Sequence, residues 1–143
     1  AGVAVSAQRH GLLPISQQSL LPYADLAYHD YEGIALNTEE KARLVSDLGQ
    51  RNFMILRNHG LLTCAETIQD AFLGMYLLNR ACEIQLLAQN ANELISVNDA
   101  IIAGIGAQAK VVLKMAGGGM AWGVFVSHAN PATGNFLSTR RLL

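Results

Sequence analysis

The sequence is poor in charge, in cysteine and in long hydrophobic runs, and each shortage excludes a class of protein. Charged residues make up 15% of the 143 residues, and the formal net charge is −1. This charge gives no positive field that would hold nucleic acid or an anionic membrane. No uninterrupted apolar stretch reaches the ~18 residues of a membrane span, and no secretory signal opens the chain. We therefore expect no nucleic-acid partner, no membrane partner and a cytoplasmic location.

The two cysteines, Cys64 and Cys82, form no Cys-x-x-Cys pair. This usage favours a reduced, cytosolic protein with two free thiols over a disulfide-stabilised one. Neither cysteine has a histidine beside it in the sequence, so neither is predicted to be an activated nucleophile. The apolar fraction of 51% and the chain length suit one globular domain with its own core.

Predicted strands and helices alternate, which is typical of a sheet covered by helices. Strands are expected at 26–31 and at 52–58, the second because four consecutive apolar residues suit a buried strand. Longer helices are expected at 38–49, from 63 to about 90, and at 98–115. Residues 1–7 are interpreted as the end of a helix that Pro14 cannot continue, and 16–26 can hold one helical turn.

The helix ends are predicted from capping residues. Thr38 is a suitable N-cap for the first of the longer helices, which Gly49 ends. Thr63 and Glu66 form a Thr-x-x-Glu capping box for the second, and Ser96 is the expected cap of the third. The helical spacing predicts two buried faces, which are Leu44, Val45 and Leu48 on the first helix and Ile68, Ala71, Phe72, Met75, Leu78 and Cys82 on the second.

Among the four histidines (His10, His29, His59 and His128), no two have the spacing of a local metal pair. His59 is the strongest candidate because it follows a buried strand, although a turn residue with a hydrogen-bonded side chain remains the alternative. His29 and Asp30 are adjacent in a predicted strand, so they point to opposite faces and do not form a dyad. The glycine-rich "MAGGGMAW" lacks the Lys-Ser/Thr of a phosphate loop and indicates a flexible helix stop.

Four stretches, "AVSAQRHGLLPISQ", "AYHDYEGIAL", "LRNHGLLT" and "AFLGMYLLNRACEIQ", together resemble the class II aldolase/adducin domain family. The segment "YHDYEGI" is more similar to the adducin-like branch. The resemblance covers residues 1–122, and 123–143 are expected to form a divergent, irregular tail. It implies an α/β fold, a three-layer α/β/α sandwich around a mainly antiparallel sheet, and a homo-oligomer, a tetramer in many family enzymes.

The resemblance also implies a chemistry. Catalytic members of the family bind a divalent metal, usually zinc, through a His-x-His pair and the histidine of "NHG", which is His59 here. The metal is a Lewis acid in the carbon–carbon cleavage of a sugar phosphate or similar hydroxy-carbonyl compound. Tyr28 matches an active-site tyrosine of the aldolase branch. The His-x-His pair and an acid/base glutamate would precede Ala1, so we expect an N-terminally incomplete (truncated) domain that is inactive alone.

Three hypotheses remain open on the sequence. The first is a metal-dependent aldehyde-lyase, or a piece of one. The second is a non-catalytic adducin-like module for oligomerisation or protein binding. The third is a truncated remnant, in which missing strands would leave a sheet edge and apolar surface uncovered and prone to aggregation.

Overall fold

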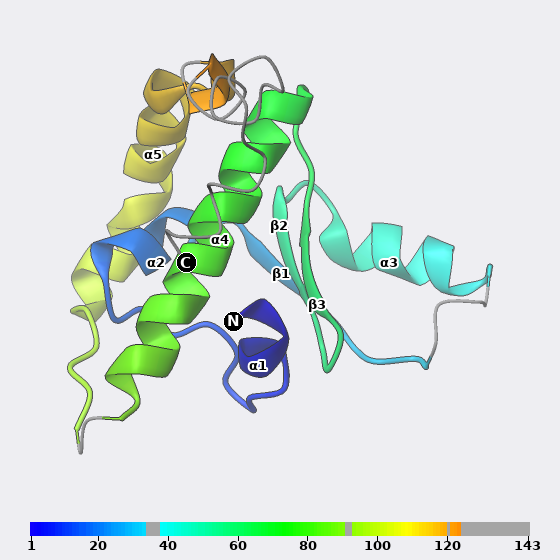
Figure 1. Cartoon of the computed structure of the whole chain (residues 1–143), viewed down its shortest axis with the longest axis horizontal. Helices are drawn as coiled ribbons and strands as arrows, with labels where there is room; N and C mark the ends of the chain where they lie inside the picture. Colours follow the sequence, from blue (N-terminus) through cyan, green and yellow to red (C-terminus); the bar gives the residue numbers. More distant parts are fainter. Residues whose placement is uncertain (34–37, 91–92, 120, 124–143) are drawn as a thin grey trace, which may run out of the picture.

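The computed structural model describes residues 1–33, 38–90, 93–119 and 121–123 of the chain (Figure 1). Its helices and strands follow one another as α1 (Gly2–Ser6), α2 (Gln17–Tyr23), β1 (Leu26–His29), α3 (Glu40–Leu48), β2 (Phe53–Leu56), β3 (Gly60–Thr63), α4 (Ile68–Ala88) and α5 (Asp99–Ala116). Of the helices in these ranges, none is both long enough and apolar enough to cross a membrane. Most of the predicted tail, residues 124–143, lies outside the described residues.

The three strands form one sheet in the order β1-β2-β3. β1 and β2 are parallel, whereas β2 and β3 are antiparallel. The sheet, predicted to be mainly antiparallel, is therefore mixed in the part of the chain that the structure describes. The connection explains the difference, because the segment containing α3 crosses over between β1 and β2, while a turn of three residues reverses the chain after β2.

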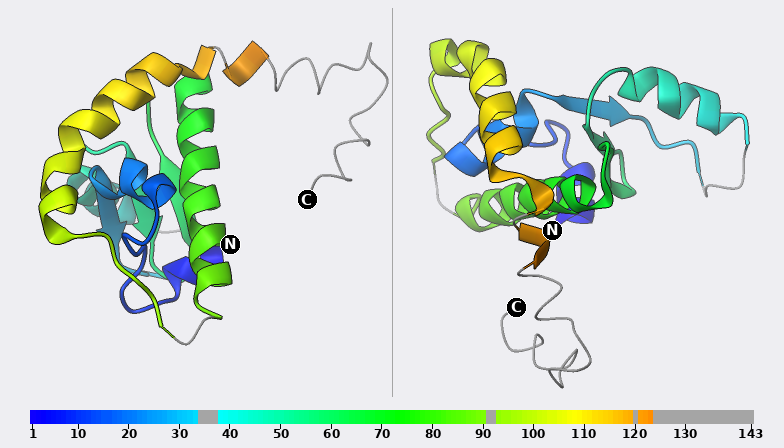
Figure 2. Two further views of the ribbon diagram at one scale, coloured as in Figure 1. Left: turned by 90° about the vertical axis from the view of Figure 1, so that its left-hand side faces the viewer. Right: turned by 90° about the horizontal axis from the view of Figure 1, so that it is seen from above.

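Helices cover both faces of this sheet. α3 packs on β1 from one side, and α1 and α4 pack on β3 from the other, as Figures 1 and 2 show. α2 packs against α4 and α5 behind that second layer. Side chains alternate along β1, so Tyr28 joins the core under α4 while His29 faces α3. The predicted α/β class and layered arrangement are confirmed.

The main core lies between the sheet and α4. It contains Val5, Leu12, Phe53, Ile55, Leu78, Ala81 and Cys82, each at most 3% exposed. Burial of a large apolar side chain contributes about 1.5–3 kcal/mol, so this cluster is the main source of stability. Gly74 allows α4 to approach β2 closely, since a Cβ there would lie 3.3 Å from the Phe53 ring.

The strand β3 was not predicted from the sequence. Because it occupies residues 60–63, the long helix starts later than predicted. Thr63, predicted as a helix cap, instead pairs with Phe53 in the sheet, and its hydroxyl donates to the Ala71 carbonyl at 2.9 Å. The actual cap of α4 is Thr67, whose Oγ1 accepts a hydrogen bond from the Asp70 N–H at 3.1 Å. Thr67 and Asp70 repeat the Thr-x-x-acid spacing four residues later, so the local pattern was ambiguous.

Other boundaries shift by a few residues. β1 ends at His29, two residues before the predicted end, and α3 begins at Glu40 with no side-chain cap at Glu39. The cap of α5 is Asn98 instead of Ser96, since the Asn98 side chain accepts from the Ala100 N–H at 2.8 Å. The predicted stop of α5 at Gly117 is confirmed. α2 runs for seven residues, because Ser16 and Ser19 form a reciprocal capping box.

The predicted buried faces are only partly correct. Leu78 and Cys82 are fully buried, but Ile68 is 76% exposed and Phe72 is 42% exposed. On α3 the predicted Val45 is 60% exposed. The buried side of α4 instead includes small residues, Gly74 and Ala81, which let the helix lie close to the sheet. Phe72 contacts the Trp122 ring edge-on, with the ring centroids 5.6 Å apart.

Candidate functional site

His59 lies in the turn between β2 and β3, with its side chain exposed to solvent. The turn needs unusual backbone angles, which Asn58 (φ 56°) and Gly60 (φ 154°) provide. Backbone hydrogen bonds fix it on two sides: the Asn58 N–H donates to the Ser6 carbonyl at 3.2 Å, and the Arg57 N–H to the His29 carbonyl at 2.8 Å. The sequence Asn-His-Gly therefore holds the backbone of His59 in a fixed position, with its side chain toward solvent.

A groove of about 240 Å³ lies beside this turn. We call it the His59 groove, and three segments line it. These are the end of β1 with the residues after it (His29, Asp30, Tyr31), the first half of α3 (Glu40, Lys41, Leu44) and the hairpin (Leu56, Arg57, His59). The groove thus brings together the two histidines that the sequence analysis considered, together with side chains of both charges.

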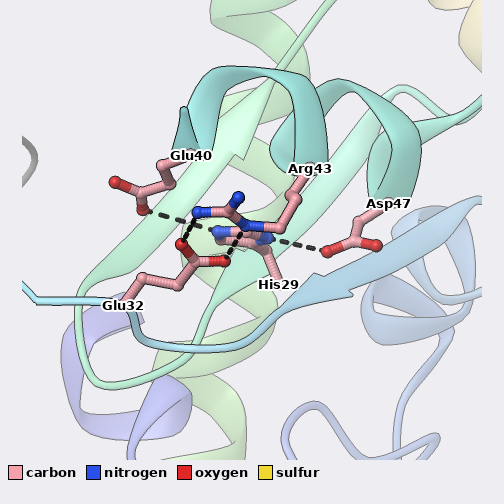
Figure 3. Close-up of polar contacts among 5 residues, drawn as sticks. All are labelled: His29, Glu32, Glu40, Arg43 and Asp47. Atoms are coloured by element: carbon pink, nitrogen blue, oxygen red, sulfur yellow. Dashed lines mark hydrogen bonds and ion pairs between the residues drawn. The ribbon is translucent and has the colours of Figure 1, made fainter. Parts of the chain in front are cut away.

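His29 forms the most connected polar cluster next to this groove (Figure 3). Its side chain is buried, and its Nδ1 lies 2.7 Å from Asp47 Oδ2 while its Nε2 lies 3.4 Å from Glu40 Oε1. Both carboxylates come from α3. Arg43, also on α3, makes a bidentate ion pair with Glu32, which lies in the segment that follows β1.

The carboxylates around His29 favour its charged form. The hydrogen bond to Asp47 raises the pKa of His29 above its ordinary value of 6.5, with smaller contributions from Glu40 and Glu32, while burial acts in the opposite direction. The Arg43 guanidinium lowers the pKa of the exposed Glu32 carboxyl. As expected from the sequence, Asp30 is not the hydrogen-bond partner of the His29 ring.

Asp47 and Glu40 are the residues that the sequence analysis missed here. They lie seven residues apart on a helix, two turns along one face. Arg43 lies between them in sequence. Charged residues at helical spacing opposite a strand histidine are a signal for these contacts, but Leu44, Val45 and Leu48 were predicted as the inward face.

Tyr28 lies on the other face of the sheet from His29. Its hydroxyl accepts a hydrogen bond from the Leu12 N–H at 3.2 Å, and the Arg57 guanidinium lies 4.3 Å from its ring centroid. Burial raises the pKa of the Tyr28 phenol. These contacts fix the ring between the core and the hairpin that carries His59, whereas the His59 groove is not lined by Tyr28.

A larger groove, of about 680 Å³, lies at the beginning of α4. Its polar lining includes Cys64, Asp70 and Lys114. The Asp70 carboxylate is already occupied, since it accepts hydrogen bonds from the Thr67 hydroxyl at 2.6 Å and the Gly118 N–H at 2.7 Å. Burial raises the pKa of the Cys82 thiol in the nearby core to about 11, so that thiol stays protonated at neutral pH.

A catalytic zinc site uses three protein ligands in tetrahedral geometry. Across the described ranges, no group of three His, Cys, Asp or Glu side chains is arranged to hold a metal ion. The described part of this chain therefore does not form a complete metal site.

Solved structures define the class of this fold. A crystal structure of an aldolase II superfamily protein from Pseudomonas syringae matches with a TM-score of 0.83 and 44% identity, over 93% of this chain and 53% of that one. The L-fuculose 1-phosphate aldolase of Glaciozyma antarctica PI12 matches with a TM-score of 0.61 and 27% identity, over 80% of this chain and 47% of that one. The fold is that of the class II aldolase superfamily.

Sequence comparison identifies the family to which this chain belongs. The family described as "Class II Aldolase and Adducin N-terminal domain" matches residues 1–86, and the chain belongs to it. A Pseudomonas aeruginosa protein whose name places it with the class 2 aldolases is 54% identical over 126 residues, 85% of this chain and 49% of that protein. Mouse alpha-adducin is 48% identical over 87 residues, 60% of this chain and 12% of adducin. The match covers about half the length of the Pseudomonas aeruginosa protein and 12% of the length of mouse alpha-adducin.

Proposed function

We propose that this chain contributes one part of the active site of a class II aldolase-type lyase, with His59 as one imidazole ligand of a divalent metal, zinc or another. The observation that carries the proposal is the exposed His59 ring on a turn fixed by backbone hydrogen bonds, beside a groove lined by charged side chains. The reaction is carbon–carbon cleavage of a sugar phosphate or similar hydroxy-carbonyl compound. The similarity to an L-fuculose 1-phosphate aldolase supports this substrate class.

The domain responsible spans residues 1–122, and 123–143 are a divergent tail. A single imidazole does not make a tight zinc site, so the 143 residues alone bind metal weakly and have no lyase activity. The remaining metal ligands and the acid/base group are supplied by a part of the family's domain outside these 143 residues. Tyr28 contributes by supporting Arg57 and the hairpin that carries His59. The working form is a homo-oligomer, a tetramer, in the cytoplasm.

A chimaera tests this assignment. Residues 1–122 of this chain replace the matching segment of the Pseudomonas aeruginosa protein, and bound metal is measured by elemental analysis of the purified protein. We expect stoichiometric divalent metal in the chimaera, little in the 143-residue chain, and loss of most of the metal in the chimaera with His59→Ala. The matched control is His10→Ala, which removes an exposed histidine outside the groove.

Two results would contradict the proposal. One is a chimaera that keeps its metal when His59 is replaced, which would show that another group is the ligand. The other is a metal-loaded chimaera that cleaves no sugar phosphate, with L-fuculose 1-phosphate as the first compound assayed.

The second candidate is a non-catalytic adducin-like module for oligomerisation or protein binding. The specific observation in its favour is the 48% identity to mouse alpha-adducin over 87 residues. A chimaera that folds and assembles but binds no metal, with or without His59, favours this candidate over the lyase.

A further inference from the structure

α3 is attached to the rest of the molecule in an unusual way for a helix of a globular domain. None of its residues is fully buried. Leu44 and Leu48 are half-buried, and Val45 is 60% exposed. Few apolar contacts therefore hold this helix, and its polar contacts account for a larger share of its attachment.

Two of those polar contacts share one side chain, and a further ion pair joins Arg43 to Glu32. His29, 3% exposed, is bonded through Nδ1 to Asp47 in the last turn of α3 and paired through Nε2 with Glu40 in the first turn (Figure 3). One imidazolium therefore hydrogen-bonds the last turn of α3, while its buried Nε2, which has no hydrogen-bond partner among the described residues, forms an ion pair with the first turn. A neutral imidazole carries a hydrogen on only one ring nitrogen, so it can donate to only one of the two carboxylates.

We propose that His29, Asp47 and Glu40 form a pH-dependent latch that holds α3 against β1 and so sets the shape of the His59 groove. The first half of α3 supplies Glu40, Lys41 and Leu44 to that groove, so movement of the helix changes it. The polar contacts of the His29 ring are to α3 and not to the hairpin that carries His59. The latch can therefore be tested in the metal-free protein, without relying on the proposed function.

The charges around His29 agree with a latch that opens when pH rises. α3 contributes Asp47, Glu40, Arg43 and Lys41. The segment after β1 contributes Glu32 and Asp30, and the hairpin contributes Arg57 and His59. Arg43 is already paired with Glu32, although its charge also acts on Glu40, so loss of the His29 charge removes the cation that is bonded to Asp47.

The sign of the effect follows from the pKa of His29, which is raised in the folded protein above 6.5. Below pH 6.5 the ring is charged in the folded and unfolded states, and the stabilisation is fully present. It is lost as pH rises through the folded-state pKa. Each unit by which the folded pKa exceeds the unfolded one corresponds to about a tenfold change in the equilibrium.

Hydrogen exchange of the metal-free, 143-residue chain tests the latch. Protection factors of the α3 amides, corrected for the intrinsic rate, are measured from acidic to mildly alkaline pH, with the α4 amides as internal reference. We expect α3 protection to fall with the titration of His29, followed by the NMR signal of its ring, while α4 protection stays constant. His29→Gln should give low α3 protection at every pH.

Asp47→Asn is the sharper variant, because its side chain is half-exposed and the replacement keeps the shape. It should lower the pH at which α3 protection falls, since the group that most raises the His29 pKa is neutral there. His10→Gln, at an exposed site, should match the unmodified chain. Protection of α3 that is constant with pH in the unmodified chain, or an unchanged midpoint in Asp47→Asn, overturns the proposal.

Discussion

Gln85 is a fully buried polar residue in a core of apolar ones, and every polar atom of its side chain is used. Its Nε2 donates to the Gly11 carbonyl at 2.8 Å and to Gln8 Oε1 at 2.7 Å, and its Oε1 accepts from the Leu13 N–H at 2.7 Å. It therefore joins α4 to the segment between α1 and α2. A buried polar group of this kind stabilises a fold only while its partners are present.

Gln85→Ala should lower the free energy of unfolding by roughly 2–4 kcal/mol, because it leaves buried backbone groups of Gly11 and Leu13 without partners. The measurement is urea unfolding, with the midpoint shifted and the slope unchanged. Gln89→Ala is the matched control, since Gln89 also bonds to Gln8 but at the surface, and should change stability by at most about 0.5 kcal/mol. Equal effects of the two replacements would refute this account of Gln85.

The individual site residues show how far sequence reasoning reaches. His59 was predicted as a site residue from its place after an apolar run and from the "RNHGL" motif, which are local signals, and it stays a prediction. The partners of His29 were not identified, because Asp47 and Glu40 meet it only after the crossover brings α3 onto β1. Residue pairs formed by tertiary packing leave little trace in a single sequence.

At the scale of elements, the start of α4 and the end of α5 are held together by two residues. Asp70 accepts the Gly118 N–H, and a Cβ added to Gly118 would lie 2.2 Å from the carbonyl carbon of Gln69. The glycine run was interpreted as a flexible helix stop. The stop at Gly117 is confirmed, but Gly118 also has a steric role, since only glycine allows this approach.

Gly118→Ala should therefore separate this segment from α4 and lower stability by about 1–3 kcal/mol, the usual range for a side chain forced into a packed site. Thermal unfolding measures the change, and faster proteolysis after the glycine run should accompany it. Gly119→Ala is the control, because a Cβ there meets no atom within 4 Å of the described structure. If Gly119→Ala is as destabilising as Gly118→Ala, the close approach is not the cause.

Element types were easier to predict than element limits. The long helix has apolar residues at helical spacing over 21 residues, and β2 consists of four consecutive apolar residues. β3 has four residues and no alternation, and Thr63 fits a helix cap as well as a strand. The choice between them depends on the pairing of Thr63 with Phe53, which is a contact between elements.

At the scale of the whole molecule, β3 pairs with β2 on one side and is an edge of the sheet within the described residues. Val3, which is 60% exposed, flanks this edge, since its Cγ2 would lie 3.7 Å from a Cβ on Gly60. An edge strand with exposed apolar neighbours is a site where a second chain can add.

We expect the 143-residue chain to self-associate as its concentration rises, measured by sedimentation velocity. Val3→Lys should shift the equilibrium toward the monomer, because it places a charge beside the β3 edge. Val45→Lys is a close control, as Val45 is equally exposed but lies on α3. A chain that stays monomeric at every concentration, or two variants that associate alike, would show that this edge is not the contact.

The hairpin turn has a consequence for any partner group that completes the His59 site. Ordering the backbone of one residue costs about 1–2 kcal/mol. The bonds of Arg57, Asn58 and His59 to three separate carbonyls fix that backbone before a ligand arrives. The backbone that carries His59 is thus pre-organised, so a ligand that binds at this turn would not have to offset the entropy of ordering the loop.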